Sequence, residues 1–305
     1  MRLSTFPTPH GDKAVLRIIP RKAVIPRLED LGLLPQTVAQ LNRLIRLPQG
    51  MIVVTGPTGS GKSTTLYTML AALNEPSRNI VTLEDPIEKK IPGINQGSLN
   101  PKSGFTFSQG LRSILRQDPN VIMVGEIRDV ETAEIAMSAS LTGHLLFTTL
   151  HTNSALGAIT RLLDMGLEPF LISAALTAVC GQRLARRVCE TCREAYSPSM
   201  DERAELADLL KRAGGQPVRF GDQLMRGKGC EDCRGSGYKG RVMLFELIEL
   251  SPAVRQMILK KGDLGDIQAQ ALSDGMSTLL IDGLRKAAMG ITTVSEVVRV
   301  AASSD

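Results

Sequence analysis

The chain has 305 residues, of which 43% are hydrophobic and 22% are charged, and its formal net charge is +5. This composition is typical of a folded globular protein of about two domains, and it excludes a disordered chain, a collagen-like chain and a dense disulfide framework. The mild positive charge is compatible with an acidic partner such as a nucleotide, a nucleic acid or lipid head groups. Because Trp is absent and aromatic residues make up only 3%, we do not expect recognition by aromatic stacking.

The opening segment 1–20 lacks the pattern of a signal peptide, and no apolar run reaches the roughly 20 residues that span a bilayer. Four of the five cysteines form two tight pairs and Cys180 stands alone. This is not the spacing of a secreted disulfide framework. We therefore predict a cytoplasmic protein.

The N-terminal part predicts a β-hairpin followed by a helix. Arg2–Thr5 and Ala14–Ile19 have strand composition, with a Pro/Gly turn between them. A two-stranded hairpin is marginal alone, so we interpret 1–20 as the remnant of a preceding domain. Residues 21–49 are expected to form a linker and a helix, the latter at Thr37–Leu47.

Strands then alternate with helices over residues 50–188. This alternation predicts an α/β core in which a parallel sheet is covered on both faces. Asp129 is expected to cap one of the helices. The predicted strands are Met51–Thr55, Ile80–Leu83, Val121–Val124 and Leu145–Thr149, and the helix after the first strand is Lys62–Leu73.

The end of this core carries a thiol and a basic cluster. Cys180 is expected to be a buried hydrophobic residue in an apolar helix with Leu176 and Val179. Gln182–Arg187 contains three arginines just before the first cysteine pair. Two interpretations of this cluster stay open: a solvated helix end, or a contact with nucleotide or another subunit.

The C-terminal part divides at the cysteines. Residues 189–240 are predicted to form a tetracysteine subdomain with a helix at Asp201–Arg212, and residues 241–305 a helical subdomain. Thr293 and Glu296 have the spacing of a capping box for the last helix.

A Gly-rich loop carries the strongest functional signal. Gly56–Ser63 matches G-x-x-x-x-G-K-[ST], follows an apolar strand and opens a helix, which is the context that distinguishes a phosphate-binding loop from a chance turn. Its backbone N–H groups and Lys62 are expected to bind phosphates, and the Ser63 hydroxyl to bind Mg²⁺. The predicted nucleotide-binding residues are Pro57, Thr58, Gly59, Ser60, Gly61, Lys62, Ser63 and Thr64.

Two acidic segments follow strands of the core. The first is Glu84–Glu88 and the second is Gly125–Asp129. An acid after an apolar strand occupies the Walker B position of a P-loop protein, but here Gly125 replaces the usual Asp and leaves Glu126 as the acid. Asp85 and Asp129 are either site residues or helix caps.

Two histidines bracket the strand that begins at Leu145. Carboxyl ends of parallel strands line the ligand crevice, so His151, beyond this strand, is expected beside the γ-phosphate. His144 is a second candidate. A lone His is more often structural, but two of the three histidines of the chain lie in this segment.

Four motifs stand in one order: the P-loop, EDPIE at Glu84–Glu88, GEIRD at Gly125–Asp129 and GHLLFTTLHT at Gly143–Thr152. As a set they resemble the Walker A, Asp box, Walker B and His box of the secretion-superfamily ATPases of the type II secretion and type IV pilus assembly kind (GspE/PilB-like). The resemblance covers nearly the whole chain. It implies a hexameric ring ATPase with a RecA-like core.

The resemblance also implies roles for individual residues. Glu88 would be the general base that polarises the attacking water, Glu126 would hold Mg²⁺ through water, and His151 would contact the γ-phosphate. Arg2 and Arg17 match arginines of the family's preceding domain that reach the nucleotide. Members of the family carry more of that domain than this chain shows. We therefore do not expect residues 1–20 to fold independently, and we expect ring assembly to be impaired.

The two cysteine pairs predict a metal site. Cys189 and Cys192, and Cys230 and Cys233, form C-x₂-C pairs separated by a stretch long enough to hold a helix. Four thiolates can close a tetrahedral structural Zn²⁺ site, while redox pairs and surface thiols are the rival interpretations. The resemblance adds that tetracysteine motifs occur in export and assembly members of the family and not in pilus-retraction members.

We therefore predict an ATPase motor with ATP, Mg²⁺ and Zn²⁺ as ligands. It would act as a hexamer, in the cytoplasm at the inner membrane, bound to assembly-platform proteins of a secretion or pilus system. The alternatives are a RecA-like nucleic-acid motor and a non-hydrolysing nucleotide-binding regulator. No dense basic stripe or set of stacking aromatics supports the former, so no nucleic acid is expected.

Overall fold

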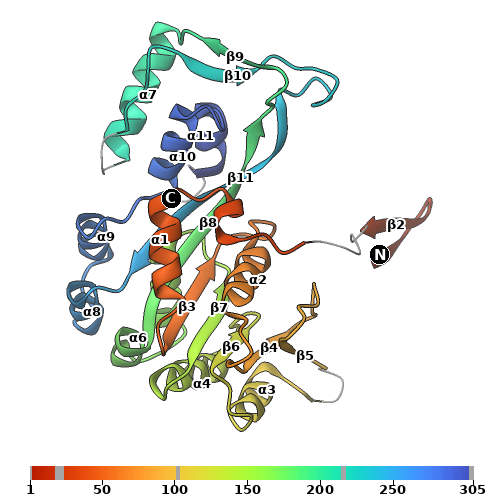
Figure 1. Cartoon of the computed structure of the whole chain (residues 1–305), viewed down its shortest axis with the longest axis vertical. Coiled ribbons are helices and arrows are strands. Elements are labelled where there is room, and N and C mark those ends of the chain that lie inside the picture. The colour runs from red at the N-terminus through yellow and green to blue at the C-terminus, as the bar shows by residue number, and fades with distance from the viewer. Residues whose placement is uncertain (1, 18–23, 101–103, 214–217, 302–305) are drawn as a thin grey trace.

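A seven-stranded mixed sheet forms the centre of the molecule (Figure 1). The computed structural model describes residues 2–17, 24–100, 104–213 and 218–301. The strand order is β11-β8-β3-β7-β6-β4-β5, in which only β11 is antiparallel to its neighbour. The predicted parallel α/β arrangement is confirmed. The strands are β3 (Gly50–Thr55), β4 (Ile80–Glu84), β5 (Asn95–Ser98), β6 (Val121–Val124), β7 (Leu145–Leu150), β8 (Leu176–Val188) and β11 (Tyr238–Glu249).

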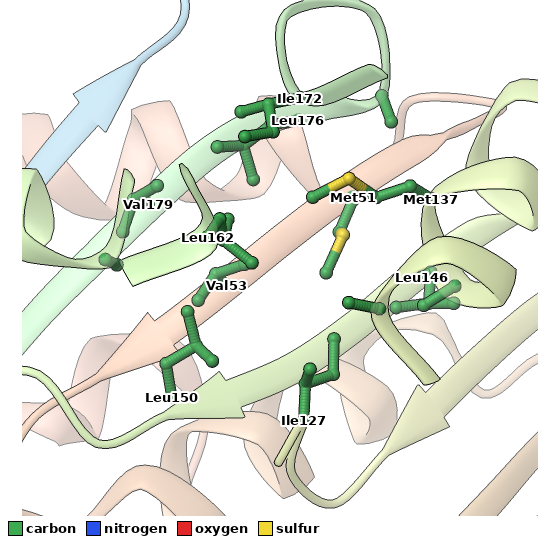
Figure 2. Close-up of a cluster of buried hydrophobic side chains, with 14 of the residues drawn as sticks. Met51, Val53, Ile127, Met137, Leu146, Leu150, Leu162, Ile172, Leu176 and Val179 are labelled. Atoms are coloured by element: carbon green, nitrogen blue, oxygen red, sulfur yellow. The ribbon is translucent and has the colours of Figure 1, made fainter. Parts of the chain in front are cut away.

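Helices cover both faces because successive strand residues point to opposite sides. Met51 and Val53 of β3 belong to one buried cluster, drawn in Figure 2, and Ile52 and Val54 to a second. The first cluster packs against α3 (Phe107–Ile114), α4 (Val130–Leu141), α5 (Ala155–Asp164), α6 (Pro169–Ala175), α8 (Pro252–Leu259) and α9 (Leu264–Ser273); the second against the 3-10 helix η1 (Leu28–Leu31), α1 (Pro35–Leu44) and α2 (Lys62–Leu73).

The C-terminal residues do not form a separate helical unit. Residues 241–249 belong to β11, the last strand of the central sheet. Helices α8 and α9 pack in the first cluster, whereas α10 (Leu279–Ala288) and α11 (Val294–Ala301) pack in a third cluster with α7 (Met200–Arg212). The predicted C-terminal helical subdomain is therefore not confirmed. Local pattern identified the helices but not which layer each one covers.

The segment around Cys180 is a strand and not the predicted helix. Cys180 lies in β8, fully buried, paired with Val54 of β3 and Leu247 of β11. A short apolar run does not distinguish a buried strand from a helix, and here two neighbouring strands decide the outcome. Its burial was predicted correctly, and burial raises the pKa of its thiol.

The N-terminal hairpin is present with a tighter turn than predicted, and the last two residues of its predicted second strand, Ile18 and Ile19, lie outside the described residues. It consists of β1 (Arg2–Thr8) and β2 (Gly11–Arg17), which pair with each other and with no other described strand. Leu3 and Phe6 are 62% and 67% exposed. These apolar side chains are not covered by any described part of the chain.

The cysteine-containing unit connects β8 to β11. It holds α7 and a two-stranded sheet of β9 (Arg193–Tyr196) and β10 (Leu224–Gly227). Ser199 and Glu202 form a capping box at the start of α7, as the acidic first turn favours. The predicted helix at Asp201–Arg212 is confirmed.

A buried ion pair attaches α10 to the sheet. Lys286 Nζ donates to Asp282 Oδ2 at 2.6 Å and to the Met243 carbonyl at 2.5 Å. Asp282 Oδ2 also accepts from the Phe245 N–H at 2.9 Å. Both side chains are almost fully buried, so each charge depends on its partner.

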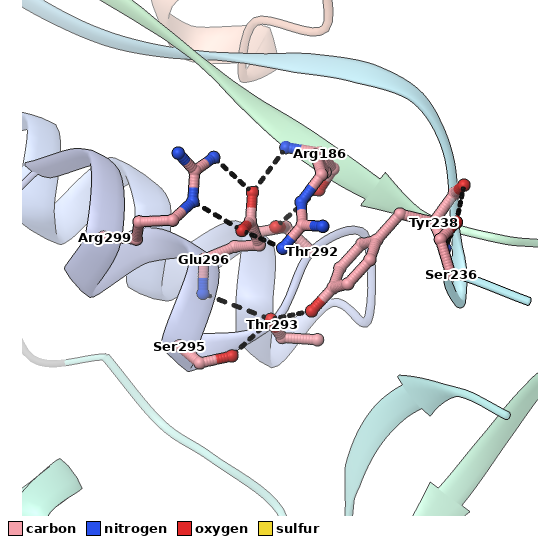
Figure 3. Close-up of polar contacts among 8 residues, drawn as sticks. All are labelled: Arg186, Ser236, Tyr238, Thr292, Thr293, Ser295, Glu296 and Arg299. Atoms are coloured by element: carbon pink, nitrogen blue, oxygen red, sulfur yellow. Dashed lines mark hydrogen bonds and ion pairs between the residues drawn. The ribbon is translucent and has the colours of Figure 1, made fainter. Parts of the chain in front are cut away.

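A carboxylate on α11 connects that helix to β8 (Figure 3). The Glu296 side chain is 2% exposed and accepts from the Arg186 N–H at 3.0 Å, from the Arg186 guanidinium at 2.6 Å and from Arg299 at 2.7 and 2.8 Å. The Arg186 guanidinium also lies 4.1 Å from the centre of the Tyr238 ring. Of the predicted capping box, the bond from the Glu296 N–H to Thr293 is present, while the carboxylate binds the two arginines.

Replacing Glu296 by Gln is expected to lower the free energy of unfolding by about 1–3 kcal/mol near neutral pH. Burial raises the pKa of this carboxyl, but Arg299 and Arg186 outweigh burial and lower it to about 2 from an ordinary value of 4.5. Its contribution is therefore complete above about pH 4.5 and is lost as the pH falls toward about 2. Urea unfolding of wild type and variant at about pH 7 and about pH 3 measures this.

The exposed Glu205 of α7 provides the control, since Glu205→Gln removes a charge without a buried partner network. A deficit of Glu296→Gln that is as large at low pH as at neutral pH would contradict the assignment.

Candidate functional site

The phosphate-binding loop connects β3 to α2 and depends on its glycines. Gly56 and Gly61 have φ values of 149° and 94°, in the region that favours glycine. A Cβ on Gly56 would lie 2.5 Å from the Gln182 carbonyl oxygen and 2.6 Å from Ser60 Oγ. The loop therefore keeps its path only with glycine at position 56.

Lys62 lies over this loop in the first turn of α2. Its Nζ donates to the carbonyls of Gly56 at 2.7 Å and Pro57 at 3.2 Å. Burial lowers the pKa of Lys62, and Arg183 lowers it further, while Glu126 opposes both. The ammonium thus lies where phosphate oxygens can replace the two carbonyls as acceptors.

The acid after β6 is paired with two basic side chains. Glu126 accepts from Arg128 and lies 3.1 Å from His151 Nε2. Burial raises the pKa of Glu126, but Arg128 and His151 outweigh it and the net shift is downward. Because β6 and β7 are neighbours, their carboxyl ends bring Glu126 and His151 together, as predicted for this edge of the sheet.

The acidic segment after β4 contains one buried and one exposed glutamate. Glu84 is 4% exposed and accepts from Tyr67, from Thr82 at 2.6 Å and from Gln96 at 3.0 Å. The Glu88 side chain is exposed, and its backbone N–H donates to the Tyr67 hydroxyl at 3.1 Å. Glu88 is therefore free to meet a ligand, whereas Glu84 is enclosed.

These groups share one cavity of about 830 Å³. Its phosphate end is lined by the loop, Lys62 and Ser63, and by the acids and His151. Its other walls come from segments far away in the sequence. The sequence did not identify them, because no local motif marks them: they are Pro26, Asp30, Leu31, Leu184, Gly240, Arg241 and Met243.

Not all predicted site residues reach the cavity. His144 precedes β7 at the opposite edge: its carbonyl accepts from the Gly50 N–H at 3.1 Å and its Nδ1 lies 3.0 Å from the Ala139 carbonyl. A strand of six residues separates it from His151, which is roughly 20 Å. The prediction of a catalytic role for His144 therefore does not fit the structure.

The two aspartates that were either site residues or helix caps have different places in the structure. Asp129 caps α4, accepting from the Thr132 N–H at 2.8 Å, while Asp85 lines the cavity.

Arg2 and Arg17 face each other in the register of the hairpin, but their side chains lie outside what the structure describes. Their predicted contact with nucleotide stays a prediction.

The basic cluster before the cysteines is part of β8 and not a solvated helix end. Gln182 is fully buried, donates to the Ser60 carbonyl at 2.8 Å and accepts from Thr65 at 2.9 Å. Arg183 is 5% exposed and donates to the Asn153 carbonyl at 2.5 Å. Gln182 therefore binds the phosphate loop and Arg183 binds the loop after His151. Both contacts are possible because β8 lies beside β3.

The four paired cysteines come together in the unit between β8 and β11. Their sulfur atoms all lie within 4.8 Å of one another, with separations of 3.9 Å for Cys189 and Cys230, 3.8 Å for Cys192 and Cys233 and 3.7 Å for Cys230 and Cys233. Tetrahedral Zn²⁺ with bonds of about 2.3 Å spaces its sulfurs by roughly 3.8 Å.

Backbone N–H groups also point at these sulfurs. Gly229 donates to Cys192 at 3.3 Å, and Cys230 and Gly237 donate to Cys233 at 3.1 and 3.2 Å. Burial raises the pKa of Cys233, but the two backbone donors and the thiols of Cys230 and Cys192 together outweigh burial, and the pKa falls to about 6. The cluster is compatible with a structural zinc ion.

Fold and site together are those of a P-loop protein of mixed α/β architecture. A family model described as "Type II/IV secretion system protein" matches residues 1–299, and the chain belongs to this family. The family predicted from the four motifs is thus confirmed.

Two curated relatives show how much of a longer protein the chain resembles. It is 50% identical to the type II secretion system protein E of Dickeya dadantii, over 98% of this chain and 58% of the relative. It is 49% identical to the type IV pilus assembly ATPase PilB of Thermus thermophilus, over 97% of this chain and 33% of the relative. The chain therefore spans between a third and three fifths of the length of these relatives.

Solved structures agree with the fold. The pilus retraction motor PilT with bound ADP is 29% identical, with a TM-score of 0.69 over 97% of this chain and 72% of that one. The Legionella pneumophila ATPase DotB is 25% identical, with a TM-score of 0.67 over 97% and 70%. Within the described residues, no helix combines the length and apolar character needed to cross a bilayer.

Proposed function

We propose that this chain is the motor core of a secretion or pilus-assembly ATPase, with a RecA-like arrangement over 50–188. It hydrolyses ATP to ADP and phosphate and couples this to the assembly of pilins or pseudopilins. The observation that carries the proposal is that the phosphate loop, Glu88, Glu126 and His151 line one cavity. The names of the secretion and pilus-assembly relatives support the same activity.

Each residue has a distinct chemical role in this proposal. Backbone N–H groups of Gly59–Ser63 and the Lys62 ammonium bind the phosphates and offset their charge. Glu88 accepts the proton of the attacking water, and His151 contacts the γ-phosphate. Ser63, and Glu126 through water, would hold Mg²⁺, which would supply positive charge beside the transferring phosphoryl group. Carboxylates and a hydroxyl are the oxygen ligands this ion prefers.

The arginines of the hairpin complete the site from another subunit in this proposal. Arg2 and Arg17 would stabilise the charge that develops on the phosphoryl group, as arginine fingers do. The assembly is then a ring, expected to be a hexamer, in the cytoplasm at the inner membrane. Its partners are the membrane-bound assembly-platform proteins.

The cysteine cluster is proposed to hold Zn²⁺ with a structural role. Cys189, Cys192, Cys230 and Cys233 would fill all four positions of a tetrahedral ion. A closed site leaves no position for substrate, so the ion stabilises the unit of α7, β9 and β10.

The direct test is Mg²⁺-dependent phosphate release measured against protein concentration. Wild type should hydrolyse ATP at a rate per chain that rises as chains associate. Lys62→Ala should lower this rate at least about 100-fold. Stimulation by DNA would favour the nucleic-acid motor instead. A high rate per chain that persists at full dilution to monomer would contradict the intersubunit mechanism.

The two histidines make a matched pair of variants. We expect His151→Ala to lower kcat about 10- to 100-fold, since it removes a group beside Glu126 in the cavity. His144→Ala should leave kcat within about twofold of the wild-type value, because His144 lies at the end of β7 away from the cavity. Steady-state ATPase assays measure both. Equal loss in the two variants would show that His151 acts only through stability.

A further inference from the structure

The buried carboxylate of Glu84 is the centre of a hydrogen-bond network that the proposed mechanism does not use. We define the Glu84 network as Glu84 with its three donors, Tyr67, Thr82 and Gln96. Tyr67 binds Oε2, and Thr82 and Gln96 bind Oε1. With both oxygens occupied and 4% of the residue exposed, Glu84 is poorly placed to take a proton from water.

Two of these donors, Tyr67 and Gln96, also bind the backbone of the segment that carries Glu88. The Tyr67 hydroxyl accepts from the Glu88 N–H at 3.1 Å while it donates to Glu84. Gln96 donates to the Lys89 carbonyl at 2.9 Å and accepts from the Ile91 N–H at 2.7 Å. Three backbone groups, at Glu88, Lys89 and Ile91, therefore anchor this segment.

Tyr67 connects this segment to the phosphate loop. It lies in α2, the helix that starts at Lys62, and its ring is 2% exposed within the second core cluster. Burial raises the pKa of its phenol, and the bond to Glu84 raises it further. The hydroxyl therefore keeps its proton and remains a donor to Glu84, which orients its lone pairs toward the Glu88 N–H.

We propose that Tyr67 and Glu84 are positioning residues that set the place of Glu88 relative to the phosphate loop. This inference rests on the proposed role of Glu88 as the base in ATP hydrolysis. Glu88 itself is exposed on the cavity wall, so its own side chain has little packing to orient it. The backbone contacts of the Glu84 network supply that orientation.

The first test measures the segment without reference to activity. Tyr67→Phe keeps the buried ring and removes only the hydroxyl. We expect amide hydrogen exchange of a peptide covering 85–91 to accelerate roughly 10-fold, because the Glu88 N–H loses its acceptor. Tyr196→Phe is the matched control, since Tyr196 also donates to a glutamate, Glu202, at 3.4 Å outside the cavity. Unchanged exchange in Tyr67→Phe would overturn the proposal.

The second test is a kinetic double-mutant cycle. Tyr67→Phe should lower kcat about 10- to 100-fold with the KM for ATP within about twofold, as for a displaced catalytic group. In a Glu88→Gln background the same change should have less than about a twofold further effect. An equal loss in both backgrounds would show that Tyr67 does not act through Glu88.

A second variant guards against misfolding. Glu84→Gln keeps the shape of the side chain and should give the same pattern: faster exchange at 85–91, lower kcat and little change in KM. Should wild type show no ATP hydrolysis, the proposed function fails, and the exchange experiment still decides whether the Glu84 network positions the segment.

Discussion

Glu88→Gln should lower kcat for ATP hydrolysis by about 100- to 10,000-fold, the range for loss of a general base. Gln keeps the size of the side chain and its hydrogen bonding to water but cannot accept the proton. Because the phosphate loop is untouched, nucleotide binding and KM should change little. Phosphate release under saturating Mg²⁺ and ATP, together with direct binding of a fluorescent ATP analogue, measures both quantities.

The matched control is Glu134→Gln, an exposed glutamate on α4 that does not line the cavity. It should keep wild-type turnover. Equal turnover by wild type and Glu88→Gln would remove Glu88 from the mechanism. Glu126 would then be the first alternative base, because it lies on the same cavity wall beside His151.

Loss of the proposed Zn²⁺ from the cysteine cluster is expected to have the largest effect on stability. Cys192→Ser should reduce bound zinc from about one ion per chain to nearly none, and the unit of α7, β9 and β10 should lose several kcal/mol of folding free energy. The reason is that this unit has few buried side chains of its own: Leu206 and Leu209 of α7 face the third cluster. Elemental analysis and limited proteolysis measure the two effects.

Cys180→Ala provides the control for loss of a thiol. Cys180 lies in the central sheet, away from the cluster, so this variant should keep its zinc. Wild-type protein that binds no zinc, or a Cys192→Ser protein that keeps it, would contradict the structural-zinc proposal.

Local patterns determined much of this protein before any tertiary contact was considered. The P-loop and the four predicted strands of the core were placed correctly to within a residue, because glycine spacing, apolar runs and caps act within a few residues. The helix at Lys62–Leu73 has the predicted bounds. The paired cysteines predicted a cluster that the structure brings together, since two C-x₂-C motifs each place two thiols at fixed spacing.

Only the tertiary structure decided which residues share the cavity. His144 and His151 are near neighbours in sequence, yet they lie at opposite ends of strand β7. Gln182 meets Ser60 because β8 lies beside β3. Tyr67 meets Glu84 because Tyr67 packs in the same core cluster as Ile80, the first residue of the strand that ends at Glu84. Cys180 is in a strand because its segment pairs with β3 on one side and β11 on the other. Such contacts depend on strand order and helix packing, which a local pattern does not encode, because the partners come from distant parts of the chain.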